Sequence, residues 1–333
     1  MEKRKLGRTG LDMSLMTFGC GAVGGLMTKG AYEDQLRAAR HALDIGVNFF
    51  DTAPLYGDGA SETHVGRLFR ELKPDVILGT KVNITQDGKS DIAGFITSSL
   101  DASLKRLGRD HVDLLQLHNS IVEGEPGIPR DLSIRQVLEE VAPHFERLKA
   151  DGKIRFCGIT AIGQTPALHR VIDAKVFDTA QVVYNMLNPS AGRPIPAGYP
   201  GQDYGQLLHR ARSAGMGTIV IRALAGGALS GQETRHPLGM ATVAPIGSGQ
   251  DYASDVAQAR RFSTVLAASG AADLVELGLR FVASHGDVST MQVGIATFDE
   301  FAGGARAIMK GALDADALTR IGALQDGFAN AAG

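Results

Sequence analysis

The sequence predicts a single (β/α)₈ TIM barrel over residues 1–333, with extended loops at the carboxyl ends of its strands. Two observations indicate this fold class. Short apolar runs alternate with longer helical patterns eight times, as in barrels of roughly 250 residues. The apolar runs lack polar alternation, which is typical of parallel strands buried on both faces. The count of eight strand–helix units makes an open doubly wound sheet the weaker alternative.

The predicted strands and helices alternate in order along the chain. The strands are runs rich in Val, Ile and Phe at residues 15–21, 47–53, 76–82, 112–118, 154–160, 180–185, 217–224 and 290–295. Helical spacing covers residues 31–46, 61–72, 90–108, 133–152, 165–174, 203–215, 254–270 with 272–286, and 298–311. Glycine tolerates the left-handed conformation that ends many helices. It stands between helix and strand at Gly46, Gly108, Gly152 and Gly215.

Composition narrows the class of protein. The chain is 44% hydrophobic and 21% charged, which suffices for a large core. A formal net charge of −2 gives no reason to expect nucleic acid or a membrane as a partner. There is no signal-peptide core, and two cysteines are too few for a disulfide scaffold. We therefore expect a soluble, cytoplasmic protein, and its oligomeric state stays open.

Four ionisable side chains follow three consecutive predicted strands. Asp51, Lys81 and His118 end the second, third and fourth runs. Tyr56 lies in the loop after the second run. Each has an ordinary explanation, since an Asp before Thr-Ala-Pro is a common turn residue and a single lysine or histidine is usually solvated or hydrogen-bonded. Chemistry in these barrels occurs at the carboxyl ends of strands, so we expect the four to form one site.

These four side chains can move a proton to or from an oxygen. A lysine cation lowers the pKa of a nearby phenol from about 10, and a carboxylate holds the lysine charged. A neutral histidine can orient a carbonyl oxygen. Proton transfer at oxygen is half of a carbonyl–alcohol interconversion. The other half is a hydride, which no side chain carries, so a nicotinamide or flavin is implied.

Several segments resemble the aldo-keto reductases. They are FFDTAPLYG, LGTKV, LLQLH, GIT, QVVYN, ALAGG and VGIATFDEF, in the family's order. The resemblance implies a barrel plugged at its bottom by a short N-terminal hairpin at residues 4–14. It also implies an NAD(P)H cofactor across the mouth and no metal. Tyr56 would be the general acid in reduction and the base in oxidation, tuned by Lys81 and Asp51. His118 would position the substrate carbonyl.

The resemblance also assigns cofactor contacts, with departures from the family pattern. Thr160 keeps a hydroxyl but Ala161 lacks the usual amide, and Gln181 matches the glutamine that completes the carboxamide site. Ile221 replaces a stacking tyrosine. Arg222 is predicted to reach the cofactor phosphates, with a rim salt bridge as its alternative. The predicted cofactor-binding residues are Gly19, Cys20, Gly21, Asp51, Thr160, Gln181, Ile221, Arg222, Leu224, Gly226, Gly294, Thr297, Glu300 and Gly304.

The positions assigned to the 2′-phosphate favour NAD over NADP. NADP-preferring relatives have basic side chains where this chain has Gly294 and Glu300. A carboxylate at Glu300 would repel a 2′-phosphate. Arg306 offers a compensating charge, and the helix after Thr297 offers backbone N–H groups.

Loops after the strands are expected to select the substrate. The predicted substrate contacts are Leu55, Tyr56, His118 and Asn119. Residues 185–204 and 230–250 form long loops that suit binding walls. The chain has no tryptophan, which favours small, polar carbonyls or sugars. Cys20 is expected to pack rather than react, because no base is assigned beside it.

The sequence therefore predicts an NAD(P)-dependent oxidoreductase. It would interconvert an aldehyde, ketone or sugar lactol with its alcohol or lactone. One alternative is an NAD-dependent sugar (aldose) dehydrogenase that works in the oxidative direction. Another is a nicotinamide-sensing regulatory subunit. The physiological substrate, the direction of reaction and the cofactor preference are left open.

Overall fold

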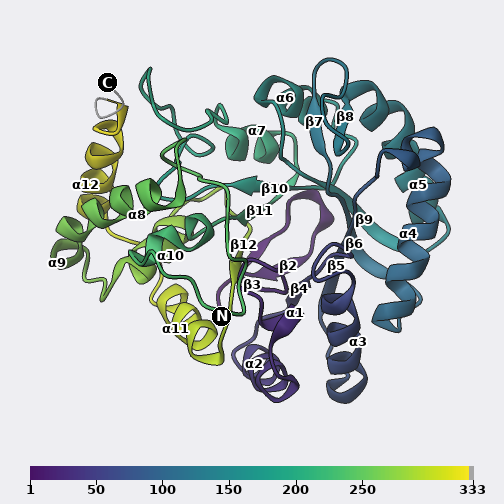
Figure 1. Cartoon of the computed structure of the whole chain (residues 1–333), viewed down its shortest axis with the longest axis horizontal. Helices are drawn as coiled ribbons and strands as arrows, with labels where there is room; N and C mark the ends of the chain where they lie inside the picture. Colours follow the sequence, from purple (N-terminus) through teal and green to yellow (C-terminus); the bar gives the residue numbers. More distant parts are fainter. Residues whose placement is uncertain (330–333) are drawn as a thin grey trace.

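Eight parallel strands form a closed barrel with helices around it in the computed structural model, which describes residues 1–329 (Figure 1). The predicted (β/α)₈ fold is confirmed, and each predicted run overlaps one strand, with β10 beginning one residue before its run. Around the barrel the strands are β3 (Met16–Gly19), β4 (Phe49–Asp51), β5 (Ile77–Val82), β6 (Val112–Leu117), β9 (Ile154–Thr160), β10 (Thr179–Val183), β11 (Gly217–Ile221) and β12 (Thr290–Gly294). Strand β12 pairs with β3 and closes the barrel.

Helices cover the outside of the barrel. They are α1 (Leu26–Lys29), α2 (Tyr32–Asp44), α3 (Ala60–Leu72), α4 (Ile92–Leu107), α5 (Ala142–Ala150), α6 (Thr165–Asp173), α7 (Leu207–Ser213), α8 (Tyr252–Arg261), α9 (Leu266–Ser269), α10 (Leu274–Ala283), α11 (Phe298–Met309) and α12 (Ala315–Asp326). The predicted helix at residues 133–152 begins as a π-helix, Gln136–Val141, and continues as α5. Within residues 1–329 no helix is both long and apolar enough to cross a membrane.

Three elements were not predicted from the sequence. They are α1, α12 and a small parallel sheet of β7 (Ser120–Val122) and β8 (Asp131–Ser133) in the loop after β6. Figure 1 shows α12 at the periphery, close to α8 and α9.

Helix α4 shows how the sequence sets the ends of an element. The Asp91 carboxylate accepts a hydrogen bond from the Gly94 N–H at 2.9 Å, which caps the first turn. Gly108 ends the helix with a φ of 65°, and its N–H donates to the carbonyl oxygen of Leu104. Gly46, Gly152 and Gly215 also have positive φ, so the predicted use of glycine at these helix ends is confirmed.

An antiparallel hairpin, β1 (Lys3–Lys5) and β2 (Asp12–Ser14), closes the bottom of the barrel. It confirms the expected N-terminal plug. Its apolar side chains pack against three strands in a bottom cluster of Leu6, Met13, Phe49, Leu114 and Ile219. Gly7 is required here, because a Cβ at that position would collide with the backbone of Gly217.

Candidate active site

The carboxyl ends of β4, β5 and β6 bring the four predicted catalytic residues together. Lys81 donates from Nζ to Asp51 Oδ2, and to the carbonyl oxygen of Thr52 at 2.8 Å. The Asp51 and Lys81 side chains are each 1% exposed. The centroid of the Tyr56 ring lies 4.9 Å from Lys81 Nζ. The His118 ring meets the Tyr56 ring edge-on, with 6.0 Å between centroids. The four residues therefore form one cluster.

Gly79 makes room for the ion pair. It pairs in register with Asp51 on the neighbouring strand. A Cβ at Gly79 would lie 3.3 Å from Asp51 Oδ1 and 3.0 Å from the Phe49 ring, so a larger residue would displace the carboxylate. Glycine at this point of β5 lets the Asp51 side chain lie flat against the next strand and face Lys81.

Mutual attraction favours the ionised form of the buried pair against the effect of burial. Burial disfavours the Lys81 cation, but Asp51 and Tyr56 more than offset this, so the pKa of Lys81 is raised. Burial raises the pKa of Asp51, and Lys81 opposes it. A lysine held charged beside a phenol is the arrangement that proton transfer at Tyr56 requires.

The pKa of Tyr56 differs from the sequence-based expectation. Lys81 acts in the predicted direction and lowers it, but burial is the larger effect, so the pKa is raised above its ordinary value. The expected net lowering is therefore wrong for the protein alone. A phenol that keeps its proton at neutral pH is the form that donates during carbonyl reduction.

His118 is neutral at physiological pH. Burial, followed by the charges of Lys81 and Arg130, lowers its pKa to about 3. Its Nδ1 is buried and has no hydrogen-bond partner. An unpaired acceptor is easier to tolerate there than an unpaired N–H, which favours the tautomer with the proton on Nε2. That N–H can donate to a carbonyl oxygen beside Tyr56.

The side chains of Gln181 and Thr160 are linked by hydrogen bonds to the Asp51–Lys81 ion pair. Gln181 donates from Nε2 to Asp51 Oδ1 at 3.2 Å, and its Oε1 accepts a hydrogen bond from the Thr160 hydroxyl at 3.1 Å. Both side chains are buried. Both residues therefore help to fix Asp51, and their expected contact with the nicotinamide carboxamide stays a prediction.

The end of β3 presents bare backbone next to the phenol. A Cβ at Gly21 would lie 3.7 Å from Tyr56 Cζ, and one at Gly19 would lie 2.7 Å from the Val293 carbonyl oxygen. Cys20 is fully buried, and burial raises the pKa of its thiol. An unreactive Cys20 agrees with the packing role expected for it.

The end of β11 turns sharply over the mouth. Ile221, its last residue, is half-buried, and Arg222 follows with a left-handed φ of 57°. Leu224 precedes a tight turn in which Gly226 has a φ of 68°. This turn needs glycine, because L side chains rarely adopt such a φ.

Side chains of Thr297 and Glu300 cap the backbone N–H groups at the start of α11. The Thr297 hydroxyl accepts from the Glu300 N–H at 3.2 Å, and the Glu300 carboxylate accepts from the Ala296 N–H at 2.7 Å. This reciprocal arrangement places a negative charge on the N-terminus of the helix. Gly294 is exposed at the tip of β12. Gly304 instead faces inward, since a Cβ there would lie 3.5 Å from Leu279 Cδ1, so packing accounts for it.

The two remaining predicted substrate contacts lie in different surroundings. Leu55 is 56% exposed at the rim beside Tyr56. Asn119 is fully buried. Its Nδ2 donates to the carbonyl oxygens of Ile84 and Arg130, and its Oδ1 accepts from the Ile84 N–H. Asn119 therefore joins two loops, and its contact with substrate stays a prediction.

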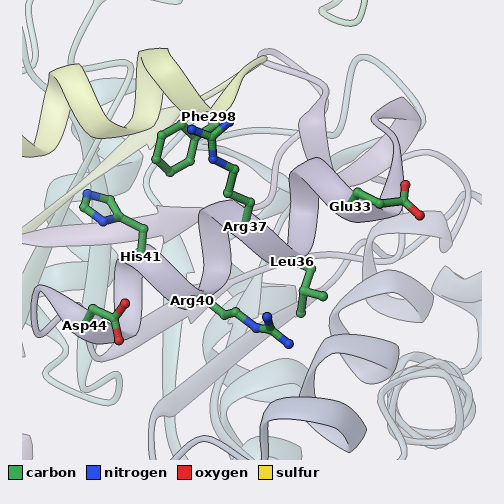
Figure 2. Close-up of a pocket in the computed structure, with 7 residues that line it drawn as sticks. All are labelled: Glu33, Leu36, Arg37, Arg40, His41, Asp44 and Phe298. Atoms are coloured by element: carbon green, nitrogen blue, oxygen red, sulfur yellow. The ribbon is translucent and has the colours of Figure 1, made fainter.

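One cavity lies away from this cluster. It has a volume of about 370 Å³ and lies between α2 and the start of α11 (Figure 2). The Arg37 guanidinium lies 3.8 Å from the centroid of the Phe298 ring in its wall. Its lining residues come from the outer helices, so it is separate from the four catalytic candidates.

The barrel and its tyrosine, lysine, aspartate and histidine define an oxidoreductase that acts on carbonyl and alcohol groups. The chain belongs to the aldo/keto reductase family, whose model matches residues 15–326. The family predicted from the sequence is therefore confirmed.

Relatives with assigned names agree with this family. L-galactose dehydrogenase of Arabidopsis thaliana is 28% identical over 90% of this chain and 86% of its own length. An aldo-keto reductase of Bacillus subtilis is 30% identical over 71% of this chain and 66% of its own. The holo form of an aldo-keto reductase from Bacillus halodurans superposes with a TM-score of 0.73 at 25% identity, covering 97% of this chain and 96% of that one.

Proposed function

We propose that this aldo-keto reductase uses NAD(P)H to interconvert an aldehyde, ketone or sugar lactol with the corresponding alcohol or lactone. Tyr56 gives a proton to the carbonyl oxygen in reduction and removes one from the hydroxyl in oxidation. The observation that carries this proposal is the Tyr56 ring lying 4.9 Å from the ammonium of Lys81, which is itself paired with Asp51. His118, neutral and edge-on to the phenol, donates to the same oxygen.

Accessible backbone at the strand ends around Tyr56 supports the binding of a dinucleotide cofactor. Gly21, half-buried beside Tyr56, and the exposed Gly294 leave backbone accessible at the ends of β3 and β12, whereas Gly19 and Gly226 are themselves buried. Such surfaces let a flat ring and a phosphate chain approach closely. When bound, a nicotinamide supplies or accepts the hydride that no side chain can carry.

The start of α11 supports a preference for NAD. Glu300 already satisfies the Ala296 N–H, and its carboxylate is exposed at the helix start. A 2′-phosphate bound there would meet a like charge. Arg306 lies close by, with Nη2 3.9 Å from the Cβ position of Gly303, so the opposition to NADP is partial.

A sugar dehydrogenase that works in the oxidative direction is the second candidate. It is supported by the likeness to L-galactose dehydrogenase over 90% of this chain. The same four residues serve both directions, because the acid of reduction is the base of oxidation.

The test is cofactor binding followed by isotope transfer. Titration of protein with NADH and NADPH should show tighter binding of NADH. Reduction of an aldehyde panel with NADH deuterated at C4 should place deuterium on the product carbinol carbon. Oxidation of L-galactose and other aldoses with NAD⁺ then separates the two candidates. Failure to bind either nucleotide would contradict the proposal. Binding without any turnover would favour the sensing subunit.

A further inference from the structure

Arg222 is a cation in an unusual position at the mouth of the barrel. Its guanidinium is half-buried, and its Nη1 is fully buried without a hydrogen-bond partner. None of the ion pairs within residues 1–329 includes this residue. A buried, unpaired guanidinium N–H costs free energy, so the surroundings of Arg222 are complete only when an acceptor is bound.

The backbone holds Arg222 in this place at a cost. Its φ of 57° lies in the left-handed region, which is unfavourable for a residue with a Cβ. Its carbonyl oxygen accepts from Asn185 Nδ2 at 3.0 Å and from the Ala225 N–H at 2.7 Å. These bonds fix the residue at the end of β11, and strain of this kind is concentrated at functional sites.

Two tyrosines, Tyr56 and Tyr204, influence the pKa of Arg222. Burial and Arg235 lower its pKa, whereas Tyr56 and Tyr204 act against this. Tyr204 belongs to the loop after β10, and burial raises its pKa to about 12 with Arg222 opposing. Its hydroxyl therefore keeps its proton at neutral pH and can donate together with the guanidinium. Arg222 directly follows β11 and Tyr204 lies in the loop after β10, so both come from the face of the barrel at which Tyr56 follows β4.

We propose that Arg222 binds a carboxylate of the substrate, so that the enzyme prefers carbonyl compounds and alcohols that carry an acidic group. A guanidinium matches a carboxylate with two parallel hydrogen bonds. The reacting carbon must lie within reach of Tyr56, and Arg222 follows a strand that ends at the same face of the barrel, so we take the acceptor to be part of the reacting molecule. This inference rests on the proposed function, and it replaces the predicted contact of Arg222 with the cofactor phosphates.

Arg235 is a natural control for Arg222. It lies at the same turn, but its donors are occupied. It donates to the carbonyl oxygens of Met240 at 2.7 Å, Gly226 at 2.5 Å and Val23 at 3.3 Å. Replacing it removes a nearby positive charge and leaves the free donor of Arg222 in place.

The test compares two aldehydes that differ by one carboxylate, 4-carboxybenzaldehyde and benzaldehyde. The ratio of their kcat/KM values should fall on the order of tenfold to a hundredfold in Arg222→Gln, as expected for a hydrogen bond to a charged group. Arg222→Lys should retain part of the ratio, and Arg235→Gln should retain nearly all of it. A ratio unchanged in Arg222→Gln, or lowered equally in Arg235→Gln, would overturn the proposal.

A binding measurement tests the same proposal without requiring the enzyme to turn over a substrate. Calorimetric titration of NAD⁺-saturated protein with benzoate should give a dissociation constant that rises about tenfold or more in Arg222→Gln, with NADH affinity within about twofold of wild type. Weaker NADH binding with unchanged benzoate binding would assign Arg222 to the cofactor phosphates and overturn the inference. Turnover of benzaldehyde in that case would leave the proposed oxidoreductase function standing.

Discussion

Fully buried side chains occur at both ends of the barrel, but they are apolar at the bottom and charged at the mouth. At the bottom, Leu6 and Leu114 are each 1% exposed and belong to a cluster of apolar side chains. At the mouth, Asp51 and Lys81 are also 1% exposed, but they carry opposite charges. Burying an ion pair gains little stability over an apolar pair and often loses some. The bottom therefore stabilises the fold, and the mouth keeps charges in place for chemistry.

Buried polar atoms without a hydrogen-bond partner occur in several parts of the described residues. On the barrel strands or directly after them they are His118 Nδ1, Arg222 Nη1, Gln292 Nε2, both amide atoms of Gln116, and Thr179 Oγ1 at the start of β10; on the outer helices they are Gln35 Oε1, His144 Nδ1 and Gln258 Oε1. The bottom cluster is made of apolar side chains. Each unpaired group lowers stability unless a ligand or water binds it. The five predictions below test this contrast.

Tyr56→Phe should cause the largest change. Removal of the phenol hydroxyl abolishes general acid catalysis, so kcat should fall by about 10² to 10⁴ with little loss of stability. Tyr32→Phe is the control, because its hydroxyl bonds Glu71 on the outer surface. Retention of most of the turnover by Tyr56→Phe would show that another group transfers the proton.

Lys81→Met should destabilise the protein by about 3–5 kcal/mol, because it leaves the Asp51 carboxylate buried without its partner. Urea unfolding measures the change, and kcat should fall as well. The double variant Asp51→Asn with Lys81→Met should recover most of the stability and none of the turnover. An unfolding midpoint equal to wild type in the single variant would contradict a buried, ionised pair.

Leu114→Ala should lower the free energy of unfolding by about 2–5 kcal/mol through a cavity in the bottom cluster. Turnover per folded molecule at 25 °C should stay close to wild type, because the substitution is remote from the mouth. Thermal unfolding and kcat at saturating substrate measure the two effects. A large loss of kcat with intact folding would show that the two ends are coupled.

His118→Asn should change the dependence of stability on pH. The folded pKa of His118 is about 3, and the unfolded value is about 6.5. Between these values the unfolded chain binds a proton that the folded site rejects, so wild-type stability falls as pH drops from about 6.5 toward 3. Urea unfolding at pH 7.5 and 5.0 should show a larger difference for wild type than for the variant. Equal differences would mean that His118 is not held neutral.

Glu300→Gln should have the smallest effect. Loss of the charge at the start of α11 should cost about 0.3–1 kcal/mol of stability. Fluorescence titration should show NADPH affinity rising relative to NADH. Asp299→Asn removes a neighbouring charge from the same turn. An equal shift there would mean that the overall charge of the helix start, and not the placement of Glu300, sets the preference.

The fold and the clustering of the four catalytic candidates could be predicted from the sequence because both follow from local patterns. Each strand is an apolar run, and Asp51, Lys81 and His118 stand where three such runs end. The carboxyl ends of parallel strands share one face of the barrel, so the cluster could be predicted without knowing any contact. Tyr56, in the loop after β4, follows from the same reasoning.

Contacts between segments that are far apart in the chain could not be predicted from the sequence. Gln181 bonds Asp51 across 130 residues, and no local pattern distinguishes that from a contact with a cofactor. Asn119 follows the predicted His118 and looks equally available, yet its amide is used between two loops. The net pKa of Tyr56 also depends on how deeply the ring is buried, which only the packed structure reveals.

The central claim is that Lys81 electrostatically stabilises the phenolate of Tyr56, and NMR titration of protein labelled with [¹³Cζ]tyrosine tests it most directly. Tyr56→Phe identifies the signal. In wild type that signal should titrate above the ordinary value of about 10, because burial raises the pKa. In Lys81→Met the pKa should move higher still, since the cation that opposes burial is lost. A Tyr56 pKa that is the same or lower in Lys81→Met would contradict the account.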